Sequence, residues 1–107
     1  MVIAIPASAD KIDALIDERF GRCSFFCFYN TQTGNQIFKR NDIKDAPGGV
    51  GLQAAEFIAN NGVDLICAVE VGPKAEGVLN RLNIKINPVD AGQTVESIIN
   101  LYSQKDI

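Results

Sequence analysis

Hydrophobic and polar positions along the chain predict five strands and three helices. Short apolar or aromatic runs bounded by turn residues are typical of strands, whereas apolar residues spaced three and four apart are typical of helices. The expected strands are residues 2–5, 24–29, 36–40, 64–69 and 84–86, and the expected helices begin near Val50, Pro73 and Thr94. Between the first two strands, a stripe formed by Ile12, Leu15 and Ile16 is expected to make one helical turn.

The connections between these elements predict how the strands pair. The turn at residues 31–34 (TQTG) is short enough to join the second and third strands as an antiparallel hairpin. In the second half of the chain helices alternate with strands, which favours parallel pairing. We therefore expect a three-layer α/β/α domain with a mixed five-stranded sheet in the order β-β-β-α-β-α-β-α, as in ribonuclease H-like proteins. A nuclease is disfavoured because the first strand, VIAI, carries no carboxylate for a catalytic metal.

Length and composition indicate one globular domain spanning residues 1–107. Hydrophobic residues make up 47% of the chain and charged residues 21%, so a core without disulfide or metal support is feasible. The net charge of −3 and the absence of a dense basic run argue against a nucleic-acid partner. The beginning of the chain lacks the features of a signal peptide, and no apolar run approaches the roughly 20 residues that cross a bilayer. We expect a cytoplasmic protein without membrane contact.

Cysteine and histidine content narrows the possible chemistry. Histidine is absent, which excludes serine-histidine, cysteine-histidine and histidine-zinc sites, and no catalytic residue is predicted. The three cysteines form no CxxC pair, so reduced thiols are expected. Cys23 and Cys27 would lie roughly 13 Å apart at about 3.3 Å per strand residue, too far to chelate one ion. Cys23, flanked by Arg19 and Arg22, is the single candidate metal ligand and reactive thiol, whereas Cys27 and Cys67 are expected in the core.

Two glycine-containing segments precede expected helices. Gly48, Gly49 and Gly51 stand where free amides and the helix dipole favour an anion, although a flexible loop that needs positive φ is an equal alternative. The segment matches neither a dinucleotide fingerprint nor a P-loop, so nucleotide binding is disfavoured. Gly72 and Pro73 follow the carboxyl end of a strand, where ligands bind in α/β sheets, or they simply make a tight turn.

Three motifs together resemble one family. They are Phe20-Gly21-Arg22 after acidic residues, the glycine-rich segment that leads into a Gln-Ala-Ala helix, and the Gly-Pro-x-Ala turn followed by Leu79. These motifs resemble the dinitrogenase iron-molybdenum cofactor biosynthesis family, which includes NifX and the C-terminal domain of NifB. The resemblance implies a ribonuclease H-like fold without nuclease activity. It also implies a non-enzymatic carrier or scaffold for iron-sulfur or molybdenum-iron-sulfur cluster precursors, with metallocofactor donor or acceptor proteins as partners.

One departure from the family bears on how a cluster would be held. Arg19 stands where family members often carry a histidine before the Phe-Gly pair. The alternatives are ligation by Cys23, retention by charge and hydrogen bonds alone, or a cofactor-free protein-interaction or regulatory module. We expect a monomer or weak homo-oligomer, and a shared anion-binding crevice where the three motifs meet. The expected site residues are Arg19, Gly21, Arg22, Cys23, Gly48, Gly49, Gly51, Gly72 and Pro73.

Overall fold

A computed structural model describes residues 1–103 and contains five strands and three helices. In chain order they are β1 (Val2–Ala7), β2 (Phe25–Asn30), β3 (Gln36–Arg40), α1 (Val50–Asn60), β4 (Leu65–Ala68), α2 (Pro73–Arg81), β5 (Lys85–Pro88) and α3 (Val95–Ser103). The five strands and three helices that the hydrophobic pattern predicts are all present, with β1 and β5 each ending two residues later than expected. Helix boundaries follow local chemistry: Pro73 occupies the first turn of α2, and the Thr94 hydroxyl accepts the Ser97 amide at 3.1 Å before α3.

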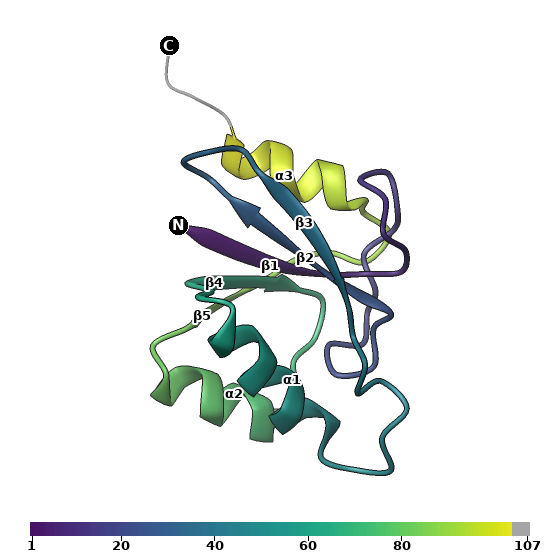
Figure 1. Cartoon of the computed structure of the whole chain (residues 1–107), viewed down its shortest axis with the longest axis vertical. Coiled ribbons are helices and arrows are strands. Elements are labelled where there is room, and N and C mark those ends of the chain that lie inside the picture. Colours follow the sequence, from purple (N-terminus) through teal and green to yellow (C-terminus); the bar gives the residue numbers. More distant parts are fainter. Residues whose placement is uncertain (104–107) are drawn as a thin grey trace.

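The strands form one mixed sheet in the order β3-β2-β1-β4-β5 (Figure 1). β1 pairs antiparallel with β2, and β2 pairs antiparallel with β3, as the short turn between them requires. β4 lies parallel to both β1 and β5, because helices make the crossover connections. The expected mixed five-stranded α/β sheet is thus confirmed.

Helices cover both faces of the sheet and produce two separate core layers. Figure 1 shows α1 and α2 on one side and α3 on the other. Because side chains alternate along a strand, Ala4, Phe26 and Phe28 pack with α1 and α2, while Ile5 and Cys27 pack with α3. β4 is covered on both faces, which explains its run of apolar residues without alternation.

The segment between β1 and β2 differs from its predicted helical turn. Ile16 forms an isolated antiparallel bridge with Ala7, and Leu15 forms one with Thr94. The Ile16 amide donates to the Gln93 carbonyl at 2.9 Å, so long-range backbone pairing replaces the local helical bonds. Ile12 and Ile16 therefore pack in the core layer that contains α3, whereas Leu15 is exposed, and the stripe does not form a helix. Within residues 1–103, no helix has both the length and the apolar character needed to span a membrane.

Candidate functional site

A cavity of about 530 Å³ opens where three separate segments meet, and we call it the site cavity. The segments are the loop before β2, the start of α1 and the start of α2. It lies beyond the carboxyl ends of β1 and β4, which is the usual position for ligands in open α/β sheets. Its lining residues are Glu18, Arg19, Phe20, Gly21, Val50, Gly51, Glu70, Gly72, Pro73, Lys74 and Ala75. The predicted shared crevice of the three motifs is present.

Phe20-Gly21-Arg22, here called the FGR loop, rests directly on the first turn of α1. A Cβ atom at Gly21 would lie 3.0 Å from Val50 Cγ2 and 3.1 Å from the Gly51 nitrogen, closer than ordinary contacts allow. Phe20 anchors the same loop in the core, with its ring edge-on to Phe26 at a centroid distance of 5.7 Å. Glycine and phenylalanine are thus needed for different reasons, close backbone approach and burial.

Asn41, which the sequence reasoning did not single out, holds the FGR loop from the inside. Its side chain is only 2% exposed, and its amide nitrogen donates to the carbonyls of Gly21 at 3.0 Å and Cys23 at 2.9 Å. The Asn41 backbone amide also donates to the Ser24 carbonyl at 2.9 Å. In the sequence, Asn41 follows Lys39 and Arg40 and begins an acidic loop, which is typical of a surface residue. The sequence therefore offers no signal for this role.

The exposure predicted for Cys23 is wrong. Cys23 is completely buried, and its thiol donates to the Phe20 carbonyl at 3.4 Å. Burial raises the pKa of this thiol to about 12, so the two arginines nearby in sequence do not produce a reactive thiolate. Cys23 does not line the site cavity. Cys27 and Cys67 are also completely buried, as expected.

The two arginines of the predicted site have different environments. Arg22 does not line the site cavity, because its Nη1 donates to the carbonyls of Lys44 at 2.8 Å and Ala46 at 3.2 Å. Arg19 does line it, while its Nε and Nη2 donate to the Asp17 carboxylate at 3.1 and 3.2 Å. This hydrogen bond and the charge of Asp17 raise the pKa of Arg19. Arg22 therefore fixes loop structure, and Arg19 supplies charge to the cavity.

The starts of α1 and α2 both line the cavity. Neither helix has a side-chain cap, so the N–H groups of the first turns have no intrahelical acceptor and no capping oxygen. In α2 these groups belong to Lys74 and Ala75, because Pro73 has no N–H. Gly49 has φ 68° immediately before α1. The alternative that this segment needs glycine for positive φ therefore holds at Gly49. Gly48 and Gly49 do not line the cavity, whereas Gly51, Gly72 and Pro73 do. Free amides and aligned dipoles at both helix starts favour an anion there.

Side chains of both charges surround the cavity, and sequence reasoning missed most of them. Lys74 in the first turn of α2 adds a second cation beside Arg19, whereas Glu18 and Glu70 contribute carboxylates. In the sequence, only the closeness of these three residues to the motifs indicates that they line the cavity. Among the described residues, no group of three or more cysteine, aspartate or glutamate side chains is placed to hold a metal ion.

Comparison with known proteins places this architecture in a family. The family model described as dinitrogenase iron-molybdenum cofactor matches residues 1–105. The chain belongs to this dinitrogenase iron-molybdenum cofactor family. It is 30% identical to an uncharacterised protein of Methanocaldococcus jannaschii over 105 residues, or 95% of this chain and 85% of that one.

Two solved structures share the fold of this chain. The apo form of the orange protein from Desulfovibrio gigas superposes with a TM-score of 0.89 at 29% identity, covering 94% of this chain and 85% of the other. A NifB-like protein from Thermotoga superposes with a TM-score of 0.81 at 28% identity, covering 95% and 86%. The similarity therefore extends over nearly the whole domain.

Proposed function

We propose that this protein is a non-enzymatic carrier or scaffold that binds an anionic metal-sulfide cluster precursor in the site cavity. Family membership supports a role linked to iron-molybdenum cofactor, and the orange protein structure is an apo form, which implies that this relative takes up a cofactor. The observation that carries the proposal is the convergence of two uncapped helix starts and Arg19 on one cavity. The domain is proposed to be of the ribonuclease H-like type, with cofactor donor or acceptor proteins as partners.

Hydrogen-bond donors, not thiolates, would hold the cargo. The buried Cys23 thiol would require the FGR loop to open before it touched a ligand, and no metal-binding group of side chains is present in residues 1–103. Sulfide ligands of a preassembled cluster accept hydrogen bonds, so the amides near Val50 and Gly72 together with Arg19 suffice to orient it. Such a site retains an iron-sulfur or molybdenum-containing cluster without replacing its own ligands.

Anaerobic binding of tetrathiomolybdate, followed by visible absorbance after desalting, tests this proposal. The protein has no tryptophan and no chromophore of its own, so retained colour reports the bound sulfide. Arg19→Ala should weaken binding about two- to fivefold, because an exposed guanidinium contributes only a screened interaction. Arg81→Ala, at the far end of α2, is the matched control and should bind normally.

Neutralising the cavity carboxylates sharpens the test. Removing the cavity carboxylates with Glu18→Gln or Glu70→Gln should strengthen tetrathiomolybdate binding, since each removes repulsion toward an anion. Protein that binds neither tetrathiomolybdate nor a reconstituted iron-sulfur cluster would contradict the carrier role and leave a cofactor-free interaction module as the function of the fold.

A further inference from the structure

A second cavity, which we call the hairpin cavity, lies at the opposite end of α1 from the site cavity. It measures about 220 Å³ and is lined by Val2, Phe28, Asn30, Thr33, Asn35, Ile37, Lys39 and Asn61. Asn61 is the C-cap of α1, whereas Val50 and Gly51 of the site cavity begin that helix. Eleven helical residues span about 16 Å, so the two cavities are distinct.

The hairpin cavity has an apolar floor because α1 ends before it covers the outer strand. Phe28 and Ile37 are paired across β2 and β3 and therefore point to the same face, the one that carries α1. Phe28 is largely buried against Phe57, but Ile37 is 53% exposed. Val2, at the start of β1, extends this apolar strip on the other side of Phe28.

A single positive charge stands at one end of this floor. Lys39 Nζ donates to Asn61 Oδ1 at 2.6 Å and lies 5.8 Å from the centre of the Phe28 ring. The C-terminal dipole of α1 favours an ammonium at this place. Within the described chain Lys39 has no carboxylate partner, and none of the other lining residues is charged. An ammonium group carries three hydrogens, so two donors remain for a ligand.

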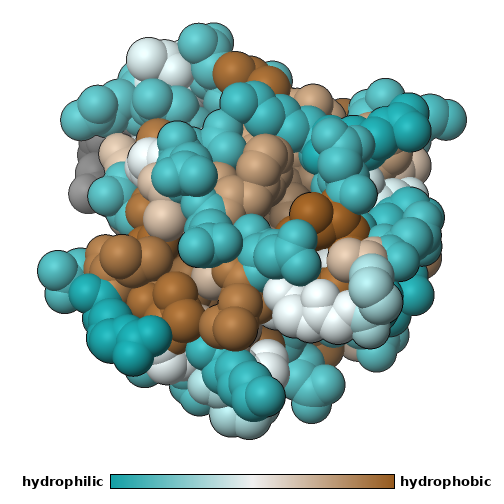
Figure 2. All heavy atoms as spheres, turned by 60° about the horizontal axis from the view of Figure 1, so that its bottom comes forward, coloured by the Kyte–Doolittle hydropathy of each residue, from teal (hydrophilic) through white to brown (hydrophobic). Residues whose placement is uncertain are grey.

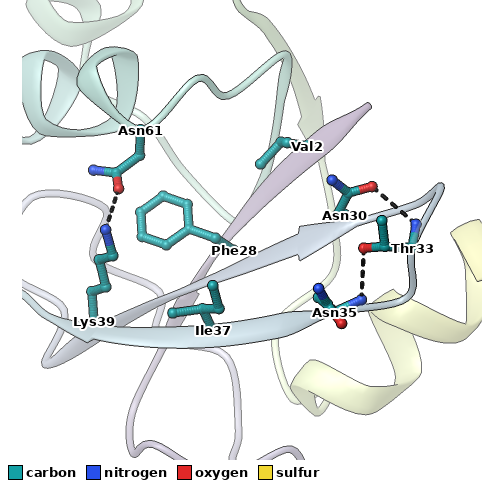
Figure 3. A pocket seen from close by; sticks show the side chains of 8 residues that line it. All are labelled: Val2, Phe28, Asn30, Thr33, Asn35, Ile37, Lys39 and Asn61. Carbon is teal, nitrogen blue, oxygen red and sulfur yellow. Dashed lines mark hydrogen bonds between the residues drawn. The ribbon is translucent and has the colours of Figure 1, made fainter.

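Amide groups of the hairpin turn stand at the other end. Figure 3 shows the Phe28 ring between the Lys39–Asn61 pair on one side and Asn30, Thr33 and Asn35 on the other. The Asn30 oxygen accepts the backbone amides of residues 32 and 33, at 2.9 and 3.1 Å, which leaves its amide nitrogen without a partner in residues 1–103. The rim is thus rich in donors.

We propose that the hairpin cavity binds a small monocarboxylate with one aromatic or branched apolar group. The apolar group would lie on Phe28 and Ile37, and the carboxylate would pair with Lys39. One unpaired cation matches a single negative charge, which disfavours multiply charged phosphates. The size also fits, because a cavity of about 150 Å³ already accommodates benzene. This inference does not depend on cluster binding, since it uses none of the residues of the site cavity.

Amide chemical shifts during titration with phenylacetate test the proposal, with neutral phenylacetamide as the matched probe. Phenylacetate should shift the amides of Phe28, Ile37, Lys39 and Asn61 in a saturable way, with a dissociation constant on the order of 1 mM, as expected for about ten heavy atoms. Phenylacetamide should bind at least about fivefold more weakly, because it lacks the charge that pairs with Lys39.

Two variants separate the charge from the apolar floor. Lys39→Met keeps most of the aliphatic side chain and should weaken phenylacetate binding about fivefold, whereas Lys85→Met on β5 should leave it unchanged. Ile37→Glu adds a like charge at an exposed strand position and should abolish binding, with thermal unfolding checking that the fold is retained. Equal binding of the two probes, equal binding by Lys39→Met and Lys85→Met, or shifts that centre on the site cavity would overturn the proposal.

Discussion

Gly21→Ala is the sharpest structural test of the site, because it adds one methyl group at the point where the FGR loop meets α1. The new Cβ would lie 3.0 Å from Val50 Cγ2 and 3.1 Å from two backbone atoms, the Val50 carbonyl carbon and the Gly51 nitrogen. A side chain can move away, but the first turn of α1 cannot shift without disturbing the glycine segment before it. We therefore expect the FGR loop to be displaced from the helix.

Gly48→Ala provides the matched control. A Cβ at Gly48 meets nothing within 4 Å, and this glycine does not have a positive φ. Overpacking of an existing contact costs about 1–3 kcal/mol, and each kcal/mol lowers the melting temperature of a domain this size by about 4–8 °C. Gly21→Ala should thus melt well below the wild type, whereas Gly48→Ala should change the free energy of unfolding by no more than about 0.5 kcal/mol.

Thermal unfolding and tetrathiomolybdate retention measure the two consequences separately. Gly21→Ala should lose retention at temperatures where it is still folded, since displacement of the loop moves Arg19 and opens the cavity between the loop and α1. Gly48→Ala should retain the sulfide. A Gly21→Ala protein that melts and binds like Gly48→Ala would show that the loop does not rest on α1 as described.

Three further predictions follow from side chains near the site and in the helices. Asn41→Ala should lower the free energy of unfolding by about 2–4 kcal/mol in urea denaturation, because two carbonyls of the loop before β2 lose their buried donor. All three cysteine thiols should resist a thiol reagent at pH 8 in folded protein and react in denaturant. The reason is that burial raises the pKa of each thiol, to about 12 for Cys23 and Cys27. Rapid labelling of Cys23 in folded protein would contradict its burial. Gly77→Ala in α2 should raise stability by about 0.5–1 kcal/mol, because its Cβ would meet nothing within 4 Å, and an unchanged or lower melting temperature would contradict this.

Local pattern was sufficient to predict most elements of this fold. The unalternating run at β4 indicates a strand buried on both faces, and the four-residue turn before β3 indicates a hairpin. Both signals arise from neighbours within a few residues. The segment around Leu15 and Ile16 was mispredicted because its partners, Thr94 and Ala7, lie at other places in the chain, and a helix-like spacing cannot show them.

The sequence predicted that the three motifs meet at one cavity, but not the contacts that their side chains make. Glycines beside helix starts and a glycine in the FGR loop are visible in the sequence, and they do meet at one cavity. The burial of Cys23 was not foreseeable, because Cys23 packs in a core cluster with residues of α1 and α2, and its carbonyl accepts from Asn41, 18 positions later. Arg22 likewise finds its acceptors, the carbonyls of Lys44 and Ala46, more than 20 positions away.

Some polar groups fix the FGR loop and others line the cavity, which suits the proposed carrier because a carrier must also release its cluster. Arg22 and Asn41 use their hydrogen bonds to join the FGR loop to the loop before α1, so the shape of the cavity is set before a ligand arrives. The groups left for the ligand are backbone amides, Lys74 and Arg19, whose exposed guanidinium already has Asp17 as a partner. A cluster bound in this way loses no sulfide ligand and gains no thiolate. Release of the cluster therefore requires only the exchange of hydrogen bonds, because Arg19 can donate to the Asp17 carboxylate again. Asp17→Asn should accordingly free Arg19 for the cargo and slow dissociation of tetrathiomolybdate after dilution, whereas faster dissociation would show that Asp17 mainly positions Arg19.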